Sequence, residues 1–141
     1  LLLFGDGPER DRLERRAPPG VYFADFEKDR RKLASALASA DMLVHSCPYE
    51  TFGLAVAEAA ACGVPVVVPD HGGARESADP SCSETYRSLD AAACAAAIER
   101  LLARAGPDLQ TRALEAAARV PTLDQHFARV LSVYDSLLHR C

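Results

Sequence analysis

The sequence contains no tryptophan, one methionine and no Cys-x-x-C pair among its five cysteines. The cysteines, at positions 47, 62, 82, 94 and 141, are odd in number, which argues against a disulfide framework, and their spacing argues against a zinc site. Basic residues are not in excess either, because 16 Lys and Arg stand against 20 Asp and Glu, a formal net charge of −4. That balance disfavours nucleic acid as a partner, and the cysteine pattern predicts free thiols in a reducing compartment.

Signals for membrane insertion and export are also missing. The most apolar run, residues 52–69, is interrupted by a carboxylate, a glycine and a proline, so it does not predict a transmembrane helix. Leu1 to Phe4 carry no basic segment and lead directly into a Gly-Asp-Gly-Pro turn, which is unlike a signal peptide. Together with the free thiols, these absences predict a cytoplasmic protein without a transmembrane segment.

Metal-binding and nucleophile patterns are absent as well. No Asp-x-Asp occurs, and the four histidines show no ligand spacing, so we expect no metal. His45 and His71 each follow an expected strand, where either contacts substrate or is an ordinary hydrogen-bonded loop residue. No orienting base and acid accompany Ser46 and Cys47, so a covalent nucleophile is not indicated.

Apolar runs alternate with helical patterns along the chain. Strands are expected at residues 1–4, 21–24, 41–45, 64–68 and 84–87, and helices at 9–16, 30–40, 52–62 and about 74–78. A long helix that Asp90 caps and Gly106-Pro107 breaks is expected next, followed by helices at about 108–119 and 122–139. This order predicts an α/β fold with a Rossmann-like, doubly wound parallel sheet that closes with long helices. We expect one α/β domain over residues 1–105, with the helices of residues 106–141 packing on it or beyond it.

The most informative stretch runs from Glu50 to Gly63. Residues 52–62 are strong helix formers with Glu58 as their only charged residue, which predicts a buried helix that Gly63 ends. The helix begins just after Glu50, where free backbone N–H groups suit a phosphate. Two carboxylates eight positions apart therefore accompany an anion site. The alternative is that Glu58 pairs with a buried arginine and Glu50 is a solvated loop acid.

The pattern Glu50-x-Phe52-Gly53-Leu54-x-x-x-Glu58, followed by Ala-x-Ala-Cys-Gly-x-Pro-Val-Val, resembles the retaining glycosyltransferases of family 4, which have the GT-B fold. Phe4-Gly5-Asp6-Gly7-Pro8-Glu9 and Gly72-Gly73-Ala74-Arg75-Glu76 also fit that family. The match is dense to about residue 80 and patchy to about residue 103. The chain departs from the family at Asp25, where glycine is usual, and at Ser46-Cys47, where Pro-Ser is common.

The resemblance implies a role for particular residues of a nucleotide-sugar-binding (donor) domain, the C-terminal half of a GT-B fold. Glu50 is implied as the catalytic carboxylate near the sugar, and Glu58 as the ligand of the ribose hydroxyls. The implied substrate-binding residues are Phe52, Gly53, Leu54 and Ala55 at the diphosphate, with Gly5, Phe26, Glu27 and His45 elsewhere on the substrate.

The implied reaction moves a sugar from a nucleotide-diphosphate sugar to an unknown acceptor, with no metal or other cofactor. In this family an acceptor domain and a diphosphate clamp precede the first strand, so we expect the present chain alone to be an inactive fragment. Peripheral membrane contact would come through that N-terminal domain. Two other functions stay open: a non-catalytic nucleotide-sugar-binding module and, with less support, a GT-B-fold sugar-nucleotide epimerase. The uridine or guanosine base also stays open.

Overall fold

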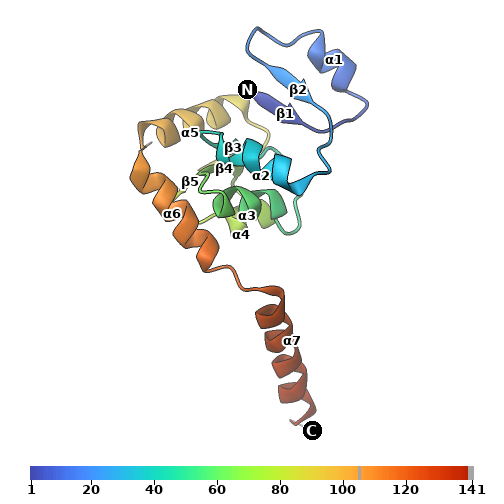
Figure 1. The fold of residues 1–141 in the computed structure, drawn as a ribbon, viewed down its shortest axis with the longest axis vertical. Helices are drawn as coiled ribbons and strands as arrows, with labels where there is room; N and C mark the ends of the chain where they lie inside the picture. Colours follow the sequence, from blue (N-terminus) through green and yellow to red (C-terminus); the bar gives the residue numbers. More distant parts are fainter. Residues whose placement is uncertain (105, 140–141) are drawn as a thin grey trace. The chain divides into compact units, whose positions relative to one another are not determined.

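The computed structural model describes residues 1–104 and 106–139, which form two compact units, residues 1–39 and 40–141. The order of strands and helices is the predicted one (Figure 1). Cysteines 47, 62, 82 and 94 are free, as predicted, while Cys141 lies outside the described residues.

The first unit is built on two short parallel strands. β1 (Leu2–Phe4) pairs with β2 (Tyr22–Ala24), with α1 (Arg10–Glu14) between them in sequence and α2 (Arg30–Ala38) following. The Asp29 carboxylate caps α2 by accepting hydrogen bonds from the N–H groups of Arg31 and Lys32. The apolar run of residues 1–4 predicts a buried strand, and this prediction is wrong, because Leu2, Leu3 and Phe4 are 49%, 38% and 45% exposed. A two-stranded sheet has few neighbours with which to cover its strands.

The second unit contains a three-stranded parallel sheet in the order β3-β4-β5. The strands are β3 (Leu43–Val44), β4 (Val66–Pro69) and β5 (Ser83–Tyr86). The continuous apolar run of residues 64–68 predicts a fully buried strand, and all four residues of β4 are indeed buried. Parallel strands bring their carboxyl ends to one edge of the sheet, so the loops that follow these strands meet there.

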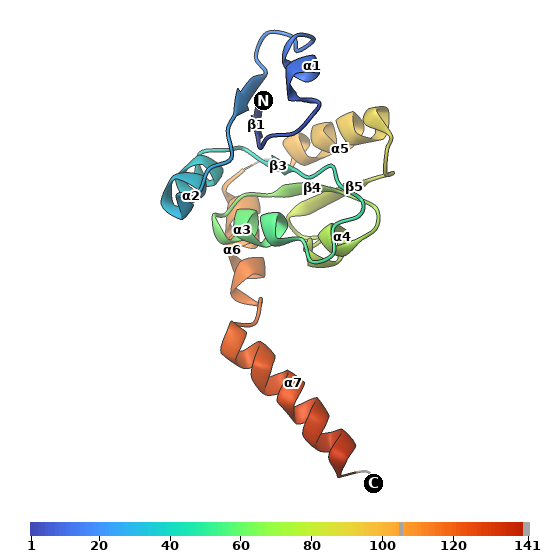
Figure 2. The same ribbon diagram turned by 90° about the vertical axis from the view of Figure 1, so that its right-hand side faces the viewer.

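Helices cover both faces of this sheet. α5 (Ala91–Ala103) contacts β4 and β5 on one face, and α3 (Leu54–Ala61) and α4 (Gly73–Ser77) contact β4 on the other (Figure 2). α6 (Pro107–Ala118) packs on α3. The core lies between α5, α6 and the sheet, and it comprises Val67, Cys82, Tyr86, Ala97, Leu101, Leu109 and Ala113.

α3 is not the fully buried helix that its sequence predicts. Its buried residues are Val56 and Ala59, whereas Leu54 is 63% exposed and Glu58 is partly exposed. The reason is that α3 contacts β4, α4 and α6 with part of its surface only, so alanines and a leucine face outward. Alanine favours a helix at exposed and buried positions alike, so an alanine-rich sequence predicts that a helix forms and does not predict that it is buried.

α7 (Leu123–Leu138) begins with a capping box, in which Thr122 and Gln125 exchange side chain to backbone hydrogen bonds. It has no buried residues. Its exposed large apolar side chains are Leu123, Phe127, Leu131, Val133, Tyr134, Leu137 and Leu138. Among the residues that the structure describes, no helix is long and apolar enough to span a membrane.

Candidate functional site

The carboxyl edge of the second unit's sheet gathers three loops, which begin at His45, Asp70 and Arg87. The Tyr86 hydroxyl donates to the His45 carbonyl oxygen at 2.9 Å, so the ends of β5 and β3 are joined directly across β4. This is the edge at which α/β folds bind ligands, and the predicted residues Glu50, Phe52, Gly53 and His45 lie in the loop that leaves β3.

Residues 45–53, the Glu50 loop, pack against the start of α4 and leave no room for a side chain at Gly72 or Gly73. The Gly73 N–H donates to the Glu50 carbonyl oxygen at 2.7 Å. A Cβ atom at Gly73 would lie 2.4 Å from the Thr51 carbonyl, and one at Gly72 would lie 2.5 Å from the Pro48 carbonyl oxygen. The two glycines therefore let two backbone segments approach each other and fix the course of the Glu50 loop.

The Glu50 carboxylate turns back onto the backbone that follows it. Its Oε1 accepts hydrogen bonds from the N–H of Thr51 at 2.9 Å and of Phe52 at 3.2 Å. These contacts lower the pKa of the Glu50 carboxyl, chiefly through the N–H groups of Phe52 and then Gly53. Gly53, at φ +81°, is the N-cap of α3 and contributes no side-chain cap. The Glu50 carboxylate thus occupies an anion site just before the first turn of α3.

His45 is the titratable neighbour of Glu50. Its Nε2 lies 3.7 Å from Glu50 Oε2, and the nearby imidazole contributes to the lowered pKa of Glu50. The His45 side chain is only 12% exposed, and its buried Nδ1 has no hydrogen-bond partner. The structure therefore brings two of the predicted site residues together.

A second polar cluster at this edge joins Asp70, His71 and Ser88. Asp70 Oδ1 accepts from the Ser88 hydroxyl at 2.7 Å and lies 2.9 Å from His71 Nδ1. The Ser88 and His71 contacts lower the pKa of Asp70 to about 2. Ser88 Oγ and Asp70 both approach the same ring nitrogen, Nδ1, so this is not the relay of a hydrolytic triad, in which base and nucleophile use opposite nitrogens. The sequence pattern did not reveal this cluster.

The remaining predicted residues of the second unit lie on α3. Leu54 is the first residue of the helix and is 63% exposed, and the next residue, Ala55, is also exposed. Glu58 lies one turn further along and is partly exposed. Glu58 therefore lies on the helix that follows the Glu50 loop.

Gly5, Phe26 and Glu27 belong to the first unit. Gly5 has φ +124° at the turn after β1, and its N–H donates to the Ala24 carbonyl oxygen at 3.2 Å. Phe26 is 71% exposed, and the Glu27 carboxylate accepts from the Asp29 N–H at 2.7 Å.

Arg10 connects this glycine turn to the loop after β2. It donates to the Gly5 carbonyl oxygen at 3.0 Å and to the Asp25 carboxylate at 2.9 Å. Asp25, where the family usually has glycine, therefore has a partner in this chain. Sequence reasoning did not single out Arg10.

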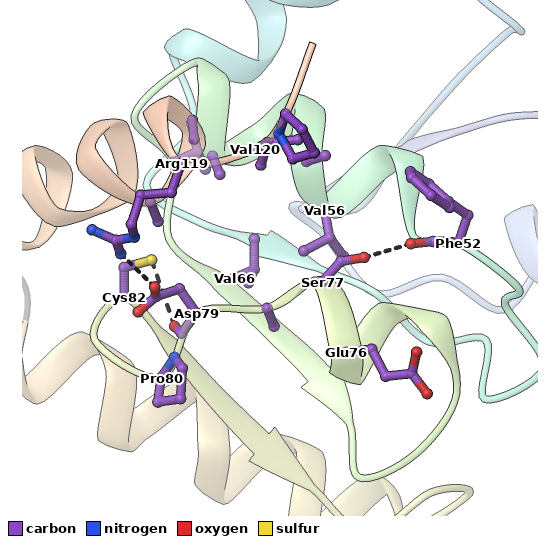
Figure 3. Close-up of a pocket in the computed structure, with 17 residues that line it drawn as sticks. Phe52, Val56, Val66, Glu76, Ser77, Asp79, Pro80, Cys82, Arg119 and Val120 are labelled. Atoms are coloured by element: carbon purple, nitrogen blue, oxygen red, sulfur yellow. Dashed lines mark hydrogen bonds and ion pairs between the residues drawn. The ribbon is translucent and has the colours of Figure 1, made fainter. Parts of the chain in front are cut away.

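A cavity of about 410 Å³ lies among α3, α4, β4 and the end of α6 (Figure 3). Its wall is mainly apolar, and Phe52 and Ser77 line it on the side of the Glu50 loop. The Ser77 hydroxyl donates to the Phe52 carbonyl oxygen at 2.5 Å. Asp79 and Arg119 form an ion pair elsewhere in its lining, at 2.5 Å.

Metal ligands are not gathered anywhere in residues 1–104 and 106–139, where no group of three His, Cys, Asp or Glu side chains has an arrangement that could hold an ion. What the described residues offer is an anion site, which the backbone N–H groups of Thr51 and Phe52 form at the carboxyl edge of the parallel sheet.

Comparison with known proteins decides the family. Residues 1–104 match the family described as glycosyl transferases group 1. The chain belongs to this glycosyltransferase family. It is 38% identical over 105 residues to a GDP-mannose-dependent alpha-mannosyltransferase of Mycolicibacterium smegmatis, an alignment that covers 73% of this chain and 28% of that protein.

Solved structures agree on the fold. Sucrose-phosphate synthase from Thermosynechococcus elongatus matches all of this chain with a TM-score of 0.81 and 28% identity, over 39% of its own length. The Anabaena protein HepE in complex with UDP matches 94% of this chain with a TM-score of 0.72 and 26% identity, over 40% of its length. The fold of this glycosyltransferase chain is thus the Rossmann-like α/β fold of GT-B enzymes, and the chain spans less than half of each of these proteins.

Proposed function

We propose that this chain is the donor-binding part of a retaining glycosyltransferase that transfers mannose from GDP-mannose to an acceptor. The observation that carries the proposal is the convergence of the Thr51 and Phe52 N–H groups on a carboxylate at the carboxyl edge of the sheet. Backbone N–H groups that hold one anion in the free chain are suited to hold another, the diphosphate of the donor.

The diphosphate replaces the Glu50 carboxylate at these N–H groups when the donor binds. Two anions cannot share one small cluster of donors without strong repulsion, so the entering diphosphate displaces Glu50. The carboxylate is then free to turn toward the sugar. There it stabilises the positive charge that develops at the anomeric carbon as the bond to the diphosphate breaks.

The other contacts of the donor follow from the family resemblance. Glu58 accepts hydrogen bonds from the ribose hydroxyls, and Leu54 and Ala55 offer N–H groups of the first helical turn to the diphosphate. Gly5 permits close approach of the backbone at the nucleotide, and Phe26 and Glu27 contact the base. His45, beside Glu50, contacts the sugar.

GDP is proposed as the nucleotide because the mycobacterial relative is named for GDP-mannose. UDP is the rival, because HepE was solved with UDP. Neither a metal nor another cofactor is part of the proposal. We also propose that residues 1–141 alone transfer no sugar, because they span only 28% of the mannosyltransferase relative and 39% of sucrose-phosphate synthase.

Isothermal titration of the 141-residue chain with GDP, UDP and guanosine tests this proposal. We expect GDP to bind more tightly than UDP, and guanosine to bind least because it lacks the diphosphate. Binding of neither diphosphate would overturn the donor-binding role. Tighter binding of UDP would mean that the donor carries uridine and not guanosine, and the donor-binding role would stand.

Incubating the chain with GDP-mannose and a mannoside acceptor tests whether residues 1–141 alone transfer mannose. We expect no acceptor-dependent release of GDP. Turnover by the chain would overturn the proposal that residues 1–141 alone transfer no sugar. A longer protein that contains this chain, binds GDP-mannose and still transfers no mannose would favour the non-catalytic binding module.

A further inference from the structure

Ser77, the last residue of α4, makes a contact that the family pattern does not explain. Its hydroxyl donates to the carbonyl oxygen of Phe52, 25 residues earlier in the chain, at 2.5 Å (Figure 3). This carbonyl belongs to the peptide bond between Phe52 and Gly53, which directly precedes α3.

Planarity of that peptide bond makes the contact directional. In a trans peptide the C=O and N–H groups are fixed in one plane and point in opposite directions. Holding the Phe52 carbonyl toward Ser77 therefore orients the Gly53 N–H toward the other side. The N–H groups of the two preceding residues, Thr51 and Phe52, donate to Glu50 Oε1, and the Gly53 N–H adds to the lowered pKa of that carboxyl, so it lies on the side of the anion site.

The surroundings explain why a restraint is needed. Gly53 has φ +81°, a backbone region in which glycine is little restricted. Phe52 and Ser77 both line the cavity of about 410 Å³, so the hydrogen bond between them lies at the cavity wall. Two residues before Phe52, the Gly73 N–H donates to the Glu50 carbonyl oxygen at 2.7 Å. α4 thus holds the Glu50 loop at two points, at Glu50 through the Gly73 backbone and at Phe52 through the Ser77 side chain.

We propose that Ser77 is a positioning residue for the donor diphosphate, since its hydroxyl fixes the Phe52–Gly53 peptide so that the Gly53 N–H faces the anion site. This inference rests on the proposed function for the identity of the anion. The orientation of the peptide does not depend on the proposed function, because the pKa of the Glu50 carboxyl is sensitive to it in the free chain.

The first test needs no ligand. The pKa of Glu50 is measured by NMR titration of its labelled side-chain carboxyl in the wild type, Ser77→Ala and Ser77→Thr. Ser77→Ala should raise the pKa of Glu50 toward its ordinary value, because the Gly53 N–H is no longer held toward it. Ser77→Thr retains the hydroxyl and should restore the low value. His45, whose Nε2 lies 3.7 Å from Glu50 Oε2, is unchanged in all three proteins.

Ser136→Ala is the matched control. The Ser136 hydroxyl also donates to a backbone carbonyl oxygen, that of Val133 at 2.7 Å, and it is also exposed, but it lies on α7. The same substitution there removes a similar hydrogen bond and should leave the pKa of Glu50 unchanged. An unchanged pKa in Ser77→Ala, with a melting temperature like that of the control, would overturn the inference.

The second test uses GDP and guanosine. Ser77→Ala should weaken GDP binding by about 3- to 10-fold, the effect of one misdirected hydrogen-bond donor, and leave guanosine binding as it is. If wild-type chain binds no GDP, the proposed function fails and the pKa test still decides the role of Ser77. If wild type and Ser77→Ala bind GDP equally, the role of Ser77 fails and the proposed function stands.

Discussion

The Glu50 carboxylate accepts a hydrogen bond from the N–H of Phe52, with 3.2 Å between Oε1 and N. A side chain predicted to act on a sugar thus fills, in the free chain, the position predicted for the diphosphate. The proposed catalytic role of Glu50 and the proposed phosphate site are therefore coupled, because the diphosphate cannot bind these N–H groups until the Glu50 carboxylate leaves them.

Replacing Glu50 by glutamine should tighten the binding of GDP to this chain, by roughly 3- to 10-fold. The neutral amide is a weaker acceptor than the carboxylate and repels the diphosphate less, so the competing group is removed. Titration of wild type and Glu50→Gln with GDP measures the change. Weaker binding by the variant would mean that Glu50 supports the diphosphate and does not compete with it.

Gly73→Ala should destabilise the second unit by about 1–3 kcal/mol and weaken GDP binding, because its Cβ would meet the Thr51 backbone. The atoms would be 2.4 Å apart, so the Glu50 loop must shift. Gly106→Ala is the control, since a Cβ there meets nothing within 4 Å. Chemical denaturation and GDP titration of both variants check this, and equal behaviour of the two would refute the close packing of loop and helix.

Glu58→Gln should weaken GDP binding by about 1–3 kcal/mol, the scale of a lost charge-assisted hydrogen bond. The loss should be smaller for 2′-deoxy-GDP, because part of the interaction is already missing from that ligand. Titrating both proteins with both nucleotides gives the coupling. If the variant loses stability and its affinity for the two nucleotides is unchanged, Glu58 has a structural role and does not bind ribose.

Asp79 provides a prediction for acid unfolding. The Ser81 hydroxyl and the Ser81 N–H both donate to Asp79 Oδ1, and these contacts, followed by Arg119, lower the pKa of Asp79 to about 2. Figure 3 shows the contact between Arg119 and Asp79. Because the folded pKa lies below the ordinary value near 4, the ionised form stabilises the fold above about pH 4, and this contribution is lost as the pH falls toward 2. Asp79→Asn should thus lower the melting temperature at pH 6, and the difference should shrink by pH 2.

Glu115→Gln, on an exposed position of α6, controls for the loss of one carboxylate. Thermal melts of the three proteins between pH 2 and pH 6 are compared. A difference between wild type and Asp79→Asn that is the same at every pH would show that Asp79 acts through packing and not through its charge.

The order of the strands and helices could be predicted from the sequence because their ends depend on local chemistry. Asp90 accepts from the Ala93 N–H at the start of α5, as a capping residue does, and Gly63 follows the end of α3 with φ +75°. These signals act within a few residues. Predictions made from them are correct to within a few positions.

Burial and the supporting contacts of the site could not be predicted in the same way. Whether Leu3 or Leu54 is covered depends on elements distant in sequence, and both proved exposed. Glu50, Phe52 and Gly53 were found because they form a contiguous pattern. Ser77 and Ser88 were not, because their contacts bridge 25 and 18 residues and involve a backbone carbonyl and a carboxylate with no fixed spacing.

The central claim, that the N–H groups before α3 receive the donor diphosphate, is tested most directly by following backbone amide signals of this chain by NMR as GDP is added. The account predicts large shifts for Phe52 and Gly53 with GDP, little change at these residues with guanosine, and simultaneous movement of the Glu50 side-chain signal as it leaves the N–H groups. GDP binding that leaves the Phe52 and Gly53 amides unmoved would contradict it.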